Sequence, residues 1–239
     1  MLILVNYFYL FYIYLIIKYK MCWNKEVSLN TFIFSTLSLL FIYYNNTYTQ
    51  YKLKEFTNIY IYILFLSFIG MQLLEYYIWD NIENKNINKN LSIIALILIL
   101  SQPLFSILLI DNNKTKNTLL TYYTLFVSLI ILIYMTTNKN MSTDISKNGH
   151  LKWNWLPRKE NTLFVILWSF YFIFLLYPLY IEKNYTTLTF FTIVLLISLF
   201  TYLKYRTYES MWCWLSNFIM FIFLFQLLIY LPYNQKSCL

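Results

Sequence analysis

Glu75 is the residue whose type and position most clearly suggest chemistry inside an otherwise apolar segment. From Met21 onward it is the only ionisable residue placed well inside a predicted membrane span. Gln72, Glu75 and Trp79 are spaced i, i+3, i+7, so a helix places them on one face. A carboxyl group at this depth usually faces the bundle interior or a water-filled cavity. It is either a proton, ion or head-group contact, or a structural carboxyl hydrogen-bonded to a neighbouring helix.

A second candidate is His150, the only histidine of the chain and the only group here that titrates near neutral pH when unperturbed. It lies in the segment 149–155, in which polar and apolar residues alternate. If the segment is extended, Leu151, Trp153 and Trp155 share one side and can pack against the end of a helical bundle. His150, on the other side, is a candidate acid or base; the plainer alternative is a loop histidine bonded to a neighbour or to water.

A third group of candidates opens the last apolar segment of the chain. Trp212 and Cys213 belong to a Met-Trp-Cys-Trp run, and Cys213 and Asn217 share a helix face at i, i+4. Cys213 is a possible nucleophile. Glu209 or Ser210 is expected to cap this helix, which explains part of the run without any function.

Zinc is the metal that these residue types could bind, because Cys22, Cys213, His150 and Glu75 all carry potential ligand atoms. No two of them have a ligand spacing such as Cys-x-x-Cys or His-x-x-x-His. The sequence therefore predicts no metal site, and it indicates no other cofactor.

The elements that must position these residues are membrane-spanning helices. Hydrophobic residues make up 60% of the 239 residues and charged residues only 12%, against about 25% charged in a soluble domain. A span needs about 20 mostly apolar residues. Seven segments meet this requirement: 28–44, 57–79, 91–110, 118–136, 162–181, 186–202 and 211–231. The sequence predicts an all-α integral membrane bundle of seven transmembrane helices from Met21, with 2–17 as a possible eighth.

The domain organisation follows from these spans. Residues 1–20 form an optional N-terminal hydrophobic segment, 21–231 form a single helical bundle, and 232–239 form a short tail. Within the bundle, Gln102 precedes Pro103 in the third of the seven spans. Because proline leaves a carbonyl of the preceding turn unpaired, we expect a kink there, with Gln102 pointing inward.

Lysine and arginine set the predicted orientation, because cytoplasmic connectors hold the excess of these residues. Twelve of the 18 lie on the side that includes the longest connector, from Thr137 to Asn161, and six lie on the other. The long connector is therefore predicted to be cytoplasmic and the C-terminus non-cytoplasmic. The net charge of +8 is spread over short connectors, so the predicted partner is the lipid bilayer and not nucleic acid.

All seven tryptophans fall in the predicted cytoplasmic half of the bundle. Anchoring at the headgroup region is the simplest explanation, although such belts usually form at both faces. A binding site rich in tryptophan at this end is the functional alternative.

Several motifs together resemble a family of multi-pass membrane proteins found in large DNA viruses and protists. The motifs are Met21-Cys22-Trp23-Asn24, Gln72-x-x-Glu75-x-x-x-Trp79, Gln102-Pro103, His150-Leu151-x-Trp153-x-Trp155 and Met211-Trp212-Cys213-Trp214. The resemblance covers Met21 to about Leu231 and favours Met21 as the start. It implies a membrane bundle but no activity, because the family has no established one.

Three functions stay open at this point. The first is a transporter, channel or small-ligand-binding membrane protein with a polar, Trp-rich site at the cytoplasmic end, for an unknown small ligand or ion. The second is a membrane-embedded enzyme acting on a lipid head group, with Glu75 or His150 as acid or base. The third is a structural membrane protein with no site. The candidate site residues are Gln72, Glu75, Trp79, Gln102, His150, Trp153, Trp155, Trp212, Cys213 and Asn217.

Overall fold

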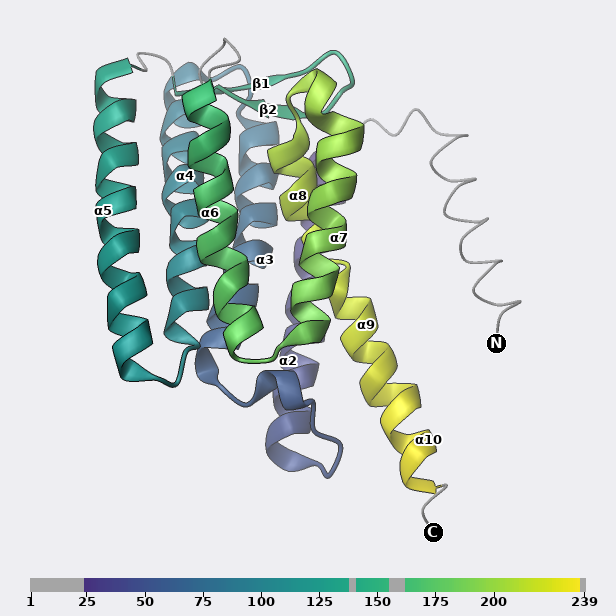
Figure 1. Ribbon diagram of the computed structural model, residues 1–239. Coiled ribbons are helices and arrows are strands. Elements are labelled where there is room, and N and C mark those ends of the chain that lie inside the picture. The colour runs from purple at the N-terminus through teal and green to yellow at the C-terminus, as the bar shows by residue number, and fades with distance from the viewer. Residues whose placement is uncertain (1–23, 138–140, 155–161, 237–239) are drawn as a thin grey trace.

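The computed structural model describes residues 24–137, 141–154 and 162–236, and these form a helical bundle with a small hairpin at one end (Figure 1). The predicted optional span 2–17, Cys22, Trp23 and Trp155 lie outside the described residues. The long helices are α2 (Lys25–Tyr48), α3 (Ile59–Asp80), α4 (Lys85–Leu108), α5 (Asn113–Thr137), α6 (Thr162–Ile181) and α7 (Tyr185–Tyr202). The shorter elements are η1 (Lys54–Phe56), β1 (Thr143–Ile145), β2 (Leu151–Trp153), η2 (Leu203–Tyr205), α8 (Tyr208–Ser216), α9 (Ile219–Phe225), the π-helical turn η3 (Gln226–Tyr230) and α10 (Leu231–Lys236).

Asparagine side chains fix the starts of three of the long helices. Asn24, Asn58 and Asn84 accept hydrogen bonds from free backbone N–H groups in the first turns of α2, α3 and α4. A short side-chain oxygen at this position satisfies one of the donors that a helix N-terminus leaves unpaired. The apolar run that follows each cap then continues as one helix.

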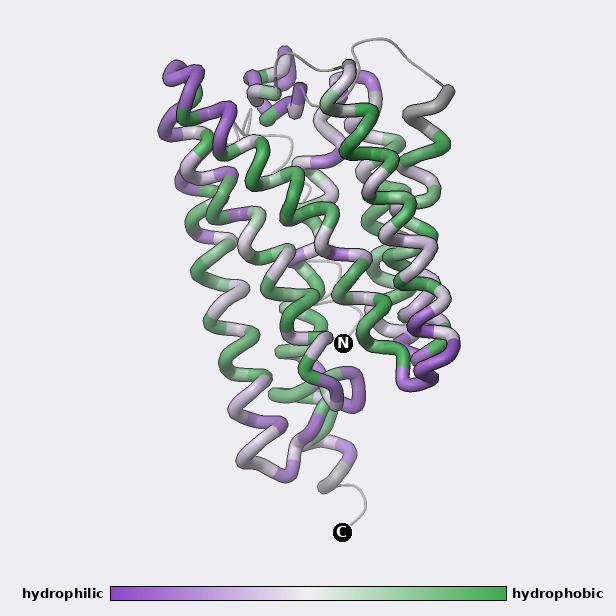
Figure 2. Tube along the Cα trace, turned by 90° about the vertical axis from the view of Figure 1, so that its left-hand side faces the viewer, coloured by the Kyte–Doolittle hydropathy of each residue, from purple (hydrophilic) through white to green (hydrophobic). Residues whose placement is uncertain are grey.

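Six helices of the described chain are long and apolar enough to cross a membrane, and Ile166–Ile181 within α6 is a shorter seventh candidate. Their outer faces carry large hydrophobic side chains, such as Leu37, Ile97, Leu125 and Phe200, that are about half exposed or more. Figure 2 shows that the middle parts of the helices are hydrophobic and that their ends are more hydrophilic. A soluble protein rarely exposes so much continuous apolar surface. The helices have the length and surface that a multi-pass membrane protein requires.

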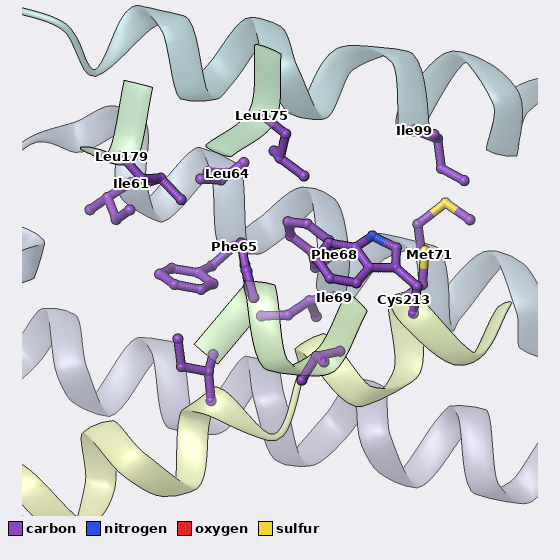
Figure 3. Packing of buried hydrophobic residues seen from close by; sticks show 14 of the residues in the cluster. Ile61, Leu64, Phe65, Phe68, Ile69, Met71, Ile99, Leu175, Leu179 and Cys213 are labelled. Atoms are coloured by element: carbon purple, nitrogen blue, oxygen red, sulfur yellow. The ribbon is translucent and has the colours of Figure 1, made fainter. Parts of the chain in front are cut away.

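Helix α3 occupies the centre of the bundle. More of it is buried than of any other candidate span, whereas α5 at the edge is the least buried (Figure 1). Its side chains Leu64, Phe65 and Phe68 belong to the apolar core, where Leu175 of α6 lies near them (Figure 3). Residues on α3 are therefore the ones that neighbouring helices surround most completely.

The long connector predicted between the fourth and fifth of the seven spans contains an antiparallel hairpin, so the all-α prediction was incomplete. Thr143 pairs with Trp153 and Ile145 with Leu151, and Gly149 in the turn has φ +80°. The hairpin lies at the end of the bundle where α3 joins α4 and α7 joins α8 (Figure 1). We call this the hairpin end.

Helix α4 holds the hairpin in place. Asn88 accepts a hydrogen bond from the Thr143 backbone N–H at 2.8 Å and donates one to the Thr143 carbonyl at 3.0 Å. The Ser92 and Thr143 hydroxyls lie 2.7 Å apart. Asn88 thus gives β1 the backbone partners that a further strand would supply.

The last span is discontinuous, whereas the sequence predicted one unbroken helix over 211–231. Helix α8 ends at Ser216, a turn follows at Asn217 and Phe218, and α9 begins at Ile219. By contrast, Pro103 does not end α4, which continues to Leu108. The interruption therefore lies in α8–α9, where the backbone N–H groups of Asn217 and Phe218 bond to the carbonyl groups three residues earlier and form a tighter helical turn inside the bundle.

Candidate membrane-embedded site

The face of α3 predicted from the i, i+3 spacing of Gln72 and Glu75 points into the bundle. Gln72 is fully buried and the Glu75 side chain is 2% exposed. Gln72 Nε2 donates a hydrogen bond to Glu75 Oε2 at 3.2 Å, and Glu75 Oε1 has no hydrogen-bond partner among the described residues. The amide therefore orients the carboxyl group and leaves one of its oxygens available.

A second buried carboxyl group, Glu209, was missed as a site residue. It was expected to cap the last span, but α8 begins at Tyr208 with Thr207 as the preceding residue, and no side-chain cap bond forms. Instead Glu209 is 2% exposed, and neither carboxyl oxygen has a hydrogen-bond partner in the described part of the chain. Its place four residues before Cys213 was the signal, since i and i+4 share a helix face.

Cys213 lies close to both carboxyl groups. Its thiol is fully buried and within electrostatic range of both Glu75 and Glu209. These residues come from α3 and from the first half of the broken span, which are packed against each other. The structure thus assembles Gln72, Glu75, Glu209 and Cys213 into one cluster, which we call the acidic cluster.

Neither Glu75 nor Glu209 forms an ion pair with a basic side chain in the described ranges 24–137, 141–154 and 162–236, although Arg206 lies within electrostatic range of Glu209. The one ion pair found there joins Lys25 to Asp80 at 2.8 Å, and both side chains are about half exposed. A charge that is buried without a partner is costly. Glu75 therefore requires a proton or a cation from outside the described side chains.

A small pocket connects Glu75 with the surface at the hairpin end. Its walls come from α2, α3, α8 and β2, and its lining residues are Val27, Ser28, Glu75, Trp79, Leu151, Ser210 and Trp214. The free volume of about 220 Å³ includes open solvent at the mouth. Glu75 is at once a lining residue of this pocket and a member of the acidic cluster.

The tryptophans predicted to form one site lie in different environments. Trp79 and Trp214 line the pocket, and Trp214 Nε1 donates a hydrogen bond to the Thr31 hydroxyl of α2 at 3.0 Å. Trp212, a predicted site residue, instead packs its ring against Phe68 and Phe191 in the apolar core. Trp153 is 2% exposed in β2 and supports the hairpin.

Asn217 stabilises the break in the last span. Its Nδ2 donates to the Cys213 carbonyl at 2.8 Å and lies 3.4 Å from the Phe68 carbonyl of α3. Its Oδ1 is buried and has no partner among the described residues. The side chain thus replaces part of the helical hydrogen bonding that the turn interrupts and links it to α3.

Gln102 was predicted to point inward and does so, but it belongs to a different contact. Tyr171 of α6 donates a hydrogen bond from its hydroxyl to Gln102 Oε1 at 2.6 Å, and both side chains are buried. The pair joins α4 to α6. Tyr171 is also within electrostatic range of Cys213.

His150 lies in the hairpin and not in the acidic cluster. Its ring stands edge-on to Tyr202 of α7, with ring centroids 5.4 Å apart. Burial lowers the pKa of His150 to about 4. The sequence prediction that this segment lies against the end of the bundle is confirmed for Leu151 and Trp153, which are buried. The possible contact of His150 with Glu75 and Cys213 is not found, because the His150 ring packs against Tyr202.

Metal binding finds no support in the described part of the chain, where no three His, Cys, Asp or Glu side chains are grouped as metal ligands. Comparison with known protein families, curated proteins and solved structures finds no match.

Proposed function

We propose that this chain is a membrane transporter that binds a small ligand at the hairpin end and uses Glu75 as its coupling carboxyl group. The observation that supports this most directly is the position of Glu75. It is buried on the central helix, has no basic partner in the described chain, and lines a pocket that opens to the surface. Ionisable groups inside membrane bundles typically belong to substrate, ion or proton pathways.

The broken last span supports transport over a purely structural role. Transporters commonly place binding sites at discontinuous helices, whose free backbone groups and local freedom serve binding and movement. Here the break at Asn217 lies one turn beyond Cys213, next to the acidic cluster. A change in the charge of Glu75 would act directly on α8, the segment that ends at this turn.

The orientation and the family resemblance also belong to the proposal. We place the hairpin end in the cytoplasm because its connectors carry the excess of lysine and arginine. The ligand would then bind from the cytoplasmic side within a lipid bilayer. The resemblance to the viral and protist family stays a prediction.

The test is a flux assay with purified protein in liposomes that contain a pH-sensitive dye. Gradients of small cations and neutral solutes are imposed, and protein-dependent pH changes are recorded. We expect wild type to couple at least one gradient to proton movement and Glu75→Gln to lose this response. Glu83→Gln is the matched control, because Glu83 lies exposed at the same end. Equal flux in wild type and Glu75→Gln would contradict the proposal.

The enzymatic alternative is measured in the same liposomes by following lipid composition. Catalysis by Cys213 would require a base beside the thiol. The structure places His150 against Tyr202, while Cys213 lies within electrostatic range of two carboxyl groups. Lipid turnover that depends on Glu75 without any flux would favour the enzyme over the transporter.

A further inference from the structure

We infer that the pocket between α2, α3, α8 and β2 recognises a primary ammonium group, with Glu75 as its counter-ion. The inference rests on the proposed function, because it names the class of ligand that the Glu75 site would take.

The hydrogen-bonding groups of the pocket match the three N–H donors of a primary ammonium group. Glu75 Oε1 is a free acceptor, since Gln72 already donates to Oε2. The Ser28 and Ser210 side chains line the same pocket and offer two hydroxyl oxygens; the Ser210 hydroxyl also lies within hydrogen-bonding range of the Glu75 carboxyl group. One anionic and two neutral acceptors therefore surround the same small space.

The aromatic walls add a second interaction that favours a cation. Trp79 of α3 and Trp214 of α8 both line the pocket. Indole is the strongest aromatic partner for a cation that lies over its ring. The Thr31 hydroxyl of α2 accepts a hydrogen bond from the Trp214 indole, so the Trp214 ring is already positioned before a ligand binds.

No lysine of the described chain fills this role. None of the lining residues is basic. Lys25, at the start of α2, is paired with Asp80. Lys152 neighbours the lining residue Leu151, but successive residues of a strand point to opposite faces, and Lys152 is more exposed than Leu151. The ammonium group must therefore come from another molecule.

The size of the pocket selects among cations. Its enclosed space holds about one ordered water molecule. An –NH₃⁺ group is of this size, whereas a trimethylammonium group is several times larger. The remainder of a ligand would extend through the mouth at the hairpin end. A free amine and the head group of an ethanolamine lipid share this chemistry.

Thermal unfolding of the purified full chain tests the inference. The protein is held in an uncharged maltoside detergent and phosphate buffer, and methylammonium chloride replaces sodium chloride at constant ionic strength. We expect the unfolding midpoint to rise by about 2–4 °C near saturation. Tetramethylammonium is expected to give no rise. Equal midpoints in methylammonium and sodium would overturn the inference.

Two variants separate the site from general effects of salt. Glu75→Gln is expected to weaken the methylammonium response at least about tenfold, and Glu83→Gln to retain it. If Glu75→Gln fails to fold, Ser210→Ala provides the second measurement, with an expected weakening of about threefold to tenfold. A full response in both Glu75→Gln and Ser210→Ala would also overturn the inference.

Nanodiscs distinguish the two sources of the ammonium group. If a lipid is the ligand, the protein should be more stable in phosphatidylethanolamine discs than in phosphatidylcholine discs, and the methylammonium response should disappear in the former. If a free amine is the ligand, the methylammonium response should be the same in both kinds of disc. Either result supports an ammonium site. A methylammonium response without flux in liposomes would keep this site and reject transport. Glu75-dependent flux without a methylammonium response would keep transport and reject this site.

Discussion

The indole of Trp214 donates a hydrogen bond to the Thr31 hydroxyl across the interface between α8 and α2, at 3.0 Å. The bond fixes Trp214, a lining residue of the pocket, against α2. It joins two segments at opposite ends of the sequence, so it forms only when the last span packs beside the first described one.

Thr31→Val is expected to destabilise the protein by about 0.6 kcal/mol, the average for a side-chain hydrogen bond between membrane helices. Unfolding in mixed micelles measures the change. Thr36→Val is the matched control, because the Thr36 hydroxyl bonds to the Phe32 carbonyl within its own helix. A double-mutant cycle with Trp214→Phe should show coupling for Thr31 and none for Thr36; the reverse result would refute this role of the bond.

Tyr171→Phe is expected to cost about 1–3 kcal/mol of unfolding free energy, because it leaves the buried Gln102 carbonyl oxygen without its donor. The same unfolding assay measures it. Tyr177→Phe is the control, since Tyr177 lies on the same helix but is exposed.

The reason for that cost can be tested with Gln102→Leu. Removing both polar partners is expected to be less harmful than removing one, so the double variant with Tyr171→Phe should recover part of the lost stability. A double variant that is as unstable as the sum of the two single variants would show that packing, and not the unpaired amide, causes the loss.

The hairpin is expected to loosen in acid because of His150. Burial lowers its pKa to about 4 in the folded protein, below the usual value of 6.5. The unfolded segment therefore binds a proton more readily, and the stabilisation is complete above about pH 6.5 and declines as the pH falls towards 4. Hydrogen exchange of the hairpin amides, corrected for the intrinsic effect of pH, should rise over this range. In His150→Gln the exchange should not depend on pH.

Asn88→Ala is expected to release β1 from α4, because Asn88 bonds to both backbone polar groups of Thr143. Exchange should accelerate at the hairpin amides while the centres of α3 and α4 stay protected. Asn86→Ala is the control, since Asn86 is exposed two residues earlier on the same helix. Uniform acceleration along the whole chain would show that Asn88 supports the bundle and not the hairpin in particular.

The proposed orientation predicts the labelling of single cysteines. Lys147→Cys in the hairpin turn should react with an impermeant maleimide only after cells are permeabilised, and Asn112→Cys at the opposite end should react in intact cells. Both positions are exposed. The background is Cys22→Ser and Cys238→Ser, with the buried Cys213 retained. Labelling in the opposite order would invert the orientation.

Much of the fold could be predicted because the features that specify it are local in the sequence. Apolar runs of about 20 residues predict spans whatever lies beside them. The face that carries Gln72 and Glu75 follows from helical spacing, and the alternation of residues 150–154 follows from strand spacing. The structure has helices over the apolar runs, buries Gln72 and Glu75 on one face, and forms a strand over residues 151–153, whereas His150 and Asn154 are buried as well as Leu151 and Trp153.

Glu209 and Trp212 show where such prediction ends. Both open the same helix, and a capping carboxylate and an interfacial indole are ordinary features of a helix start. In the structure the carboxyl is buried near Cys213 and the indole packs against Phe68. Burial depends on which helices surround a position, and helical spacing does not report that.

The sequence by itself determined that Glu75 lies within a helix, on one face with Gln72, in a chain of membrane-length apolar segments, because these properties depend on residues a few positions apart. Only the tertiary structure decided that Cys213 lies within electrostatic range of both Glu75 and Glu209, and that a turn at Asn217 interrupts the last span. It also decided that two tryptophans and two serines from α2, α3 and α8 share one pocket with Glu75. Those relationships require segments distant in the chain to pack together. The pocket therefore exists only in the folded bundle.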